Sequence, residues 1–312
     1  MDDTAGAVPE TGPYWRSVLV TGAGGGIGLA TALHLAGQGW AVIGTVRTPA
    51  QAGLVTRAAA ERGCRVRTVL LDLSEPASGA EAMAAVADLT YGGPWAVVNN
   101  VVVPQAGSAE DGDDGQARRL IETGLLGAMR ICRLALPAMQ RGGGGRIVNV
   151  SAGPGRAPRW MDGRPGPGRD VLSALTHRLR AECAQLGVRV SLVEPGALAT
   201  ALLAQTVDDP AARCAEGRPG QDGTGALLQV ADHRVPGAEA VARTVGRALS
   251  SPRPRARYPV GVDARLLVPL SAAALPWRTD PVGRAAAGLL RRPRTTPVQQ
   301  EWVAAGPERP AR

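Results

Sequence analysis

The chain has 312 residues, a formal net charge of +8 and no lysine, so all 35 of its basic residues are arginine. Hydrophobic residues make up 45% of it and charged residues 20%, which is typical of a globular protein and excludes a wholly disordered or fibrous one. The arginines are scattered and no aromatic residues alternate with them, so the positive charge does not indicate a nucleic-acid surface.

Apolar, β-rich runs alternate with longer segments of helical period along the first 195 residues. This alternation is the signature of βαβ units, which build a parallel sheet covered by helices on both faces. We therefore expect an α/β fold, a Rossmann-type doubly wound parallel sheet in a single domain. The predicted strands are 17–21, 41–46, 66–71, 95–99, 146–151 and 188–193, and the predicted helices are 26–38, 49–62, 77–89, 116–140, 169–186 and 238–250.

Three further segments lack this alternation. Residues 197–236 are rich in Gly, Pro and Asp, and such an irregular excursion inside a compact domain is typical of a substrate loop or lid. Residues 1–15 are expected to be a disordered tail, and residues 291–312 a basic, Pro-rich one.

Neither a membrane nor a metal is expected as a partner. No apolar run reaches the roughly 18 residues of a spanning helix, and the first residues lack the pattern of a secretion signal. The cysteines lie too far apart in the sequence for paired metal ligands, so we expect reduced, structural thiols and a cytoplasmic protein. They are Cys64, Cys132, Cys183 and Cys214.

A glycine-rich turn joins the first predicted strand to the first predicted helix. In this context glycines let the backbone approach a pyrophosphate, and the helix N-terminus offers N–H donors and partial positive charge. The sequence therefore predicts a dinucleotide site. Its residues are Thr21, Gly22, Gly24, Gly25, Gly26, Ile27 and Gly28.

The end of the second predicted strand indicates which dinucleotide is bound. A site that prefers NAD carries Asp or Glu there for the ribose hydroxyls, whereas this chain has Arg47. An arginine at this position favours a 2′-phosphate, so the predicted cofactor is NADP(H).

Several further motifs, in order along the chain, resemble those of the short-chain dehydrogenase/reductase family, in particular its hydroxysteroid and retinol dehydrogenase branch. The resemblance covers about residues 16–290 and implies further cofactor contacts. Asp72 and Leu73 are similar to the family's adenine-contacting element, Asn99 begins a segment like its Asn-Asn-Ala-Gly, and residues 257–261 resemble its C-terminal segment. The implied nicotinamide-side contacts are Arg169, Pro195, Gly196 and Thr200.

The family's catalytic residues are a different matter. Its members use an Asn, a Ser, a Tyr acid and a Lys, and the corresponding positions here hold Gly124, Ala152, Pro165 and Arg169. No shift of the alignment restores the pair of Tyr and Lys, because the chain has no Lys and its only tyrosines are Tyr14, Tyr91 and Tyr258. The catalytic residues are therefore unknown from the sequence.

Three functions stay open. The chain is either an atypical NADP(H)-dependent ketoreductase of bacterial specialised, polyketide-like metabolism, which we favour, or an inactive partner of an active relative, or a redox-neutral cyclase or isomerase. The resemblance also implies a small-molecule substrate. Family members commonly pair through the helices that correspond to 116–140 and 169–186, so we expect a homo-oligomer or a hetero-oligomer with another member of the family.

Overall fold

The computed structural model describes residues 16–100, 114–151, 167–195 and 237–261. The two predicted tails, the loop or lid at 197–236, and the site candidates Ala152, Pro165, Gly196 and Thr200 lie outside these residues. Arg169 lies in a described helix, but its side chain is outside the description.

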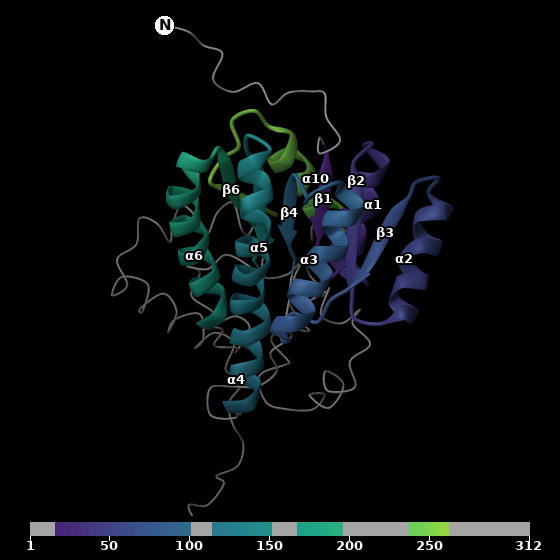
Figure 1. Ribbon diagram of the computed structural model, residues 1–312, viewed down its shortest axis with the longest axis horizontal. Helices are drawn as coiled ribbons and strands as arrows, with labels where there is room; N and C mark the ends of the chain where they lie inside the picture. Colours follow the sequence, from purple (N-terminus) through teal and green to yellow (C-terminus); the bar gives the residue numbers. More distant parts are fainter. Residues whose placement is uncertain (1–15, 101–113, 152–166, 196–236, 262–312) are drawn as a thin grey trace, which may run out of the picture.

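The described residues form one parallel sheet of seven strands in the order β3-β2-β1-β4-β5-β6-β7, as expected for a Rossmann-type doubly wound fold (Figure 1). The inner strands are largely apolar and buried because both faces of the sheet are covered, whereas the edge strands β3 and β7 are only partly buried. They are β1 (Ser17–Val20), β2 (Ala41–Val46), β3 (Val66–Leu70), β4 (Ala96–Asn99), β5 (Gly145–Val150), β6 (Val188–Pro195) and β7 (Arg257–Val260).

Helices cover both faces of the sheet, and the sheet separates two hydrophobic cores. Along β1 the side chains alternate, so that Val18 and Val20 enter one core while Leu19 enters the other. The first core lies against α1 (Gly26–Gly37), α2 (Pro49–Glu61) and α10 (Ala238–Ser250). The second core lies against α3 (Pro76–Thr90), α5 (Ala128–Arg141) and α6 (Pro167–Cys183), which lie in front of the sheet in Figure 1.

The predicted helix at 116–140 is the element that differs most from its prediction. It forms as α4 (Asp114–Ile121), a π-helical turn η2 (Glu122–Gly127) and α5, in direct succession. At the end of η2, Gly127 packs directly against Leu73. A Cβ at position 127 would lie 2.8 Å from Cβ of Leu73 and 2.9 Å from its carbonyl oxygen, so only a glycine fits there.

The predicted helix at 169–186 begins slightly earlier than expected and ends in a short 3₁₀ turn, η4 (Ala184–Leu186). β7 was not among the predicted strands. No helix in the described part of the chain is long and apolar enough to span a bilayer.

Candidate functional site

The candidate site lies where the strand order reverses. β1 pairs with β2 on one side and with β4 on the other, and the chain leaves β1 at the carboxyl edge of the sheet. In open α/β sheets ligands bind outside the carboxyl ends of the strands at such a switch point. The glycine-rich turn predicted from the sequence follows β1 at this point.

Two glycines in the turn are required by its backbone. Gly22 has φ +65°, and a Cβ there would lie 2.6 Å from the carbonyl oxygen of Asn100. A Cβ on Gly28 would lie 2.0 Å from the carbonyl oxygen of Gly22. Both contacts are with backbone atoms, which cannot swing away, so neither position accepts a side chain without a change in the turn.

Hydrogen bonds from both neighbouring strands hold the turn. On the β2 side, the N–H of Gly22 donates to Oγ1 of Thr45 at 3.3 Å, and the N–H of Ala23 donates to the Thr45 carbonyl at 2.8 Å. On the β4 side, Oγ1 of Thr21 accepts from the N–H of Asn100 at 2.9 Å, and the Asn100 amide donates to the Thr21 carbonyl. The turn is therefore fixed before any ligand arrives.

Helix α1 begins at Gly26, where the sequence predicts the helix to start. Its N-cap is Gly25, which has no side chain to cap the helix, and its first turn carries no acidic residue. The first N–H groups of a helix have no partner within it, and the helix dipole favours an anion there. Gly25 and Gly26 are exposed while Ile27 is buried, so the backbone itself faces the site.

Arg47 is exposed and directly follows β2. Its N–H donates to Oε1 of Gln51 at 2.9 Å, and a Cβ on Gly24 would lie 2.9 Å from Cδ of the same glutamine. Gln51, in the first turn of α2, therefore lies between the glycine turn and Arg47; the N-cap of α2 is Thr48. This arrangement sets Arg47 beside the turn.

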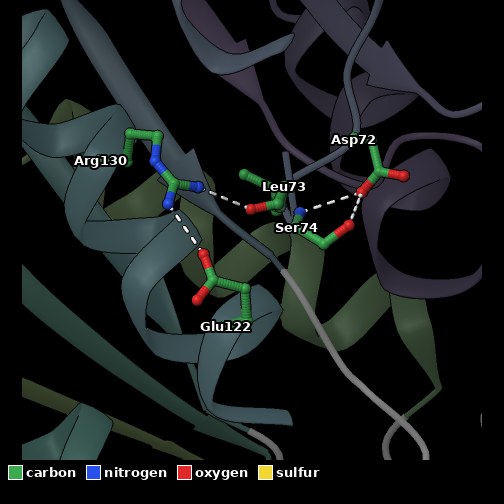
Figure 2. A network of polar contacts seen from close by, with 5 residues as sticks. All are labelled: Asp72, Leu73, Ser74, Glu122 and Arg130. Carbon is green, nitrogen blue, oxygen red and sulfur yellow. Dashed lines mark hydrogen bonds and ion pairs between the residues drawn. The ribbon is translucent and has the colours of Figure 1, made fainter. Parts of the chain in front are cut away.

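Asp72 follows β3 on the same edge of the sheet. Its carboxylate accepts hydrogen bonds from the N–H of Ser74 at 2.9 Å and from the Ser74 hydroxyl at 2.6 Å (Figure 2). These two bonds lower the pKa of Asp72 the most, and the charge of Arg47 lowers it further. Arg47 and Asp72 therefore lie close enough for the arginine charge to act on the carboxylate.

Leu73 is buried, and its side chain belongs to the core beneath α3 and α5. Its carbonyl oxygen accepts a hydrogen bond from Arg130 (Figure 2). Of the two residues that are similar to the family's adenine-contacting element, Asp72 is therefore exposed, whereas Leu73 is buried and holds the loop against the core.

Asn99 points into the interior. Its amide donates to Oδ1 of Asn149 at 2.9 Å and to Sγ of Cys132 at 3.2 Å, and the Asn149 amide donates to Thr176 on α6 at 2.8 Å. Burial raises the pKa of Cys132 to about 12. The network ties β4 and β5 to α5 and α6, so the side chain of Asn99 supports the sheet while its strand end lies at the site.

Gly124, Arg169 and Pro195 are the described residues among those predicted at the catalytic and nicotinamide end of the site, and none of them is an acid. Gly124 lies in η2, and no atom among the described residues lies within 4 Å of where its Cβ would be. Arg169 is in the first turn of α6, and the buried Pro195 ends β6. No group of three His, Cys, Asp or Glu residues in the described part of the chain is arranged to hold a metal ion.

Three site residues were not found from the sequence. Asn100 and Gln51 contact the glycine turn, and Arg130 contacts the loop after β3. Asn100 adjoins the predicted Asn99, which is a signal that was available. Gln51 stands three residues after the N-cap Thr48, as the glutamine of a capping box does. Arg130 had no such signal, because its partners lie far away in the sequence or eight residues back.

Comparisons with known proteins agree on one family. Residues 16–211 match the short chain dehydrogenase family. The chain is 30% identical to the uncharacterized oxidoreductase YbbO of Escherichia coli K12 over 245 residues, which cover 78% of this chain and 85% of the relative. It is 29% identical to human retinol dehydrogenase 5 over 269 residues, which cover 80% of this chain and 82% of the relative.

Solved structures show the same fold. A short-chain dehydrogenase from Streptomyces avermitilis is similar at a TM-score of 0.68 and 26% identity, covering 88% of this chain and 97% of that one. A single-residue variant of the actinorhodin polyketide ketoreductase, solved with NADPH, is similar at a TM-score of 0.65 and 23% identity, covering 82% of this chain and 98% of that one.

Proposed function

Because the chain belongs to the short-chain dehydrogenase family, we propose that it is an NADP(H)-dependent oxidoreductase that reduces a ketone on a small molecule. The observation that carries the proposal is the glycine turn at the switch point, with the uncapped start of α1 and Arg47 beside it. The NADPH in the ketoreductase structure of the same fold supports the choice of cofactor.

Each part of the described edge suits one part of the cofactor. The N–H groups at Gly25 and Gly26 would receive the pyrophosphate, because backbone and helix dipole both favour an anion there. The guanidinium of Arg47 would pair with the 2′-phosphate, and a charge-assisted bond of this kind is stronger than one between neutral groups. A carboxylate at position 47 would repel the same phosphate.

The reduction itself needs a hydride at the carbonyl carbon and a proton at its oxygen, and bound NADPH would supply the hydride. We propose that the proton comes from water, either directly or through a neighbouring hydroxyl of an activated, polyketide-like ketone, which donates its proton and takes one back from water. Gly124 lies in η2, whose π-helical turn is wider than an α-helical one, and a glycine supplies no proton. The chain also has no Lys that could lower the pKa of an acid. Arginine at position 169 stays protonated, so it would orient the ligand but would not relay a proton.

Pairing with a second subunit is a further proposal. Ile121, Leu126 and Met129, along α4, η2 and α5, are each 40–44% exposed. Large apolar side chains gathered on one exposed helical segment indicate a protein interface. The same interface would also suit a second candidate function, in which the chain is the non-catalytic partner of an active relative.

Titration calorimetry tests the cofactor, with NADPH and NADH added to the parent protein and to Arg47→Asp. We expect NADPH to bind more tightly than NADH in the parent, and Arg47→Asp to lose that preference. Arg57→Asp is the matched control, because Arg57 is exposed on α2 and the charge change is the same. Equal affinity for both cofactors in the parent would contradict the preference. Tight NADPH binding without NADPH consumption on any ketone would favour the non-catalytic partner.

A further inference from the structure

Arg130 joins two parts of the molecule that are far apart in the sequence. Its Nη1 donates to the carbonyl oxygen of Leu73 at 2.8 Å, and its Nη2 forms an ion pair with Oε1 of Glu122 at 2.8 Å (Figure 2). The Arg130 side chain is 13% exposed and that of Glu122 is 35% exposed. One guanidinium therefore holds the loop after β3 and the first residue of η2 together, shielded from most of the solvent.

The two parts also interlock through two glycines. Gly127, the last residue of η2, packs so closely on Leu73 that there is no room for a Cβ. A Cβ on Gly79 of α3 would lie 3.0 Å from Cδ of Arg130, so this glycine makes room for the arginine. The loop cannot shift toward or away from the helix without breaking these contacts.

The first residue of the loop, Leu71, donates its N–H to the Val46 carbonyl on β2 at 2.9 Å, whereas the hydrogen bonds of Asp72 are local. Asp72 accepts two hydrogen bonds from Ser74, and the N–H of Asp72 donates to the hydroxyl of Ser78. These bonds fix the shape of the loop, but they join no other element except the start of α3. Among the described polar contacts, those of Arg130 alone tie the loop to η2.

We propose that Arg130 is a positioning residue that couples the adenosine end of the cofactor site to the wide turn η2. The inference rests on the proposed NADP(H) site, because the loop that Arg130 holds follows β3 at the carboxyl edge of the sheet, beside the end of β2 where Arg47 stands. When a ligand settles against the loop, the Leu73 carbonyl and Arg130 hold η2 in its wide form. The coupling is reciprocal, because two sites that bias one element change each other's binding equally.

The test uses adenosine 2′,5′-bisphosphate, which carries the adenosine end of NADP(H) and no nicotinamide. Arg130→Met should bind this probe about tenfold more weakly than the parent, equivalent to about 1.4 kcal/mol. The matched control is Arg178→Met, which removes an exposed ion pair with Glu182 on α6 and touches neither part, so it should bind as the parent does. Arg130→Lys keeps the charge and should recover part of the affinity, and it replaces the Met variant if that variant fails to fold.

Hydrogen exchange gives the readout that a merely structural role would not produce. In the parent, the probe should slow exchange at the amides of 72–79 and also of 122–127, whereas in the Arg130 variants it should slow the first group only. Probe affinity equal to the parent's, or η2 protected equally in parent and variants, would overturn the proposal. If the parent binds neither NADPH nor the probe, the proposed function fails. The coupling then stands only if Arg130→Met speeds exchange in both segments without ligand.

Discussion

Arg257 on β7 contacts both carboxylate oxygens of Glu194 on β6. Its Nε donates to Oε2 at 2.8 Å and its Nη2 to Oε1 at 2.5 Å. Glu194 is fully buried, whereas the Arg257 side chain is 32% exposed. The hydrogen bonds to Glu194 raise the pKa of Arg257. The pair fastens the last strand of the sheet to β6 one residue before Pro195, where β6 ends at the site.

We expect Arg257→Met to lower the free energy of unfolding by about 3–5 kcal/mol, because it leaves a buried carboxylate without its cation. Adding Glu194→Leu should restore much of that loss, since no buried charge then remains. Urea unfolding of the single and double variants measures both effects. Arg178→Met serves as the control. It removes an exposed ion pair with Glu182, so it should lower the free energy of unfolding by less than about 1 kcal/mol. A single variant as stable as the parent would contradict the expectation.

A second prediction separates two glycines of the turn. Gly28→Ala should destabilise the protein and abolish NADPH binding, because its Cβ would meet the Gly22 carbonyl oxygen at 2.0 Å. Gly25→Ala should keep the parent's melting temperature, because φ is 178° and no described atom lies within 4 Å of the new Cβ. Its NADPH affinity should nevertheless fall by about tenfold or more, since the methyl group stands where the pyrophosphate approaches the backbone.

Melting curves and calorimetry check both glycine variants. If a folded Gly25→Ala variant bound NADPH as tightly as the parent does, the pyrophosphate would not bind at Gly25 and the prediction would be wrong.

Much of the fold was predictable because most of the described strands are short, mainly apolar runs bounded by turn residues. The starts of α1 and β2 agree with their predictions to the residue. β7 was missed as a strand because Arg257–Val260 is short, begins with arginine and contains Pro259. Its place in the sheet depends on β6 and the buried Glu194, which are contacts that a local pattern does not contain.

The candidate site was predictable where a backbone demand fixes the residue type, as at Gly22 and Gly28. It was not predictable where a side chain works through distant packing. Glu122 and Arg130 are eight residues apart, which is not a spacing that places two side chains together on a regular α-helix, and the π turn between them changes the register. No periodicity rule therefore signals their ion pair.

The third prediction concerns pH and Cys132. Burial raises the pKa of this thiol to about 12 from an ordinary value of 9.0, so the folded state keeps a proton that the unfolded chain releases. The stabilisation is therefore fully present below pH 9 and is lost as pH rises toward 12, by at most about 1.4 kcal/mol per pH unit. Urea unfolding between pH 8 and 11 on the parent and on Cys132→Ala measures the slope.

The alanine variant should be less stable at pH 8 but should lose less stability toward pH 11. Equal slopes would contradict a buried, protonated thiol. As an independent check, mass spectrometry after iodoacetamide treatment at pH 8 should find Cys132 unmodified in the folded protein.

The last prediction tests our expectation that the family's four catalytic residues are replaced in this chain, with the variant Gly124→Asn, Ala152→Ser, Pro165→Tyr, Arg169→Lys. The Asn fits at η2, because the space beside Gly124 is open among the described residues, so Gly124→Asn alone is the control for folding.

A positioned general acid contributes a factor of about 10²–10⁴ to the rate, so restoring an acid would raise kcat clearly if proton donation by the protein were limiting. We expect no gain above about tenfold on the best ketone found in an NADPH-consumption screen, because a substrate that supplies its own proton makes the new acid redundant. The sequence around Pro165 favours the same outcome, because it is rich in Gly and Pro, and we expect that a Tyr grafted there would not take up the position of the family's acid. A larger gain in steady-state kcat would show that a protein acid limits the reaction and that the substrate does not replace it.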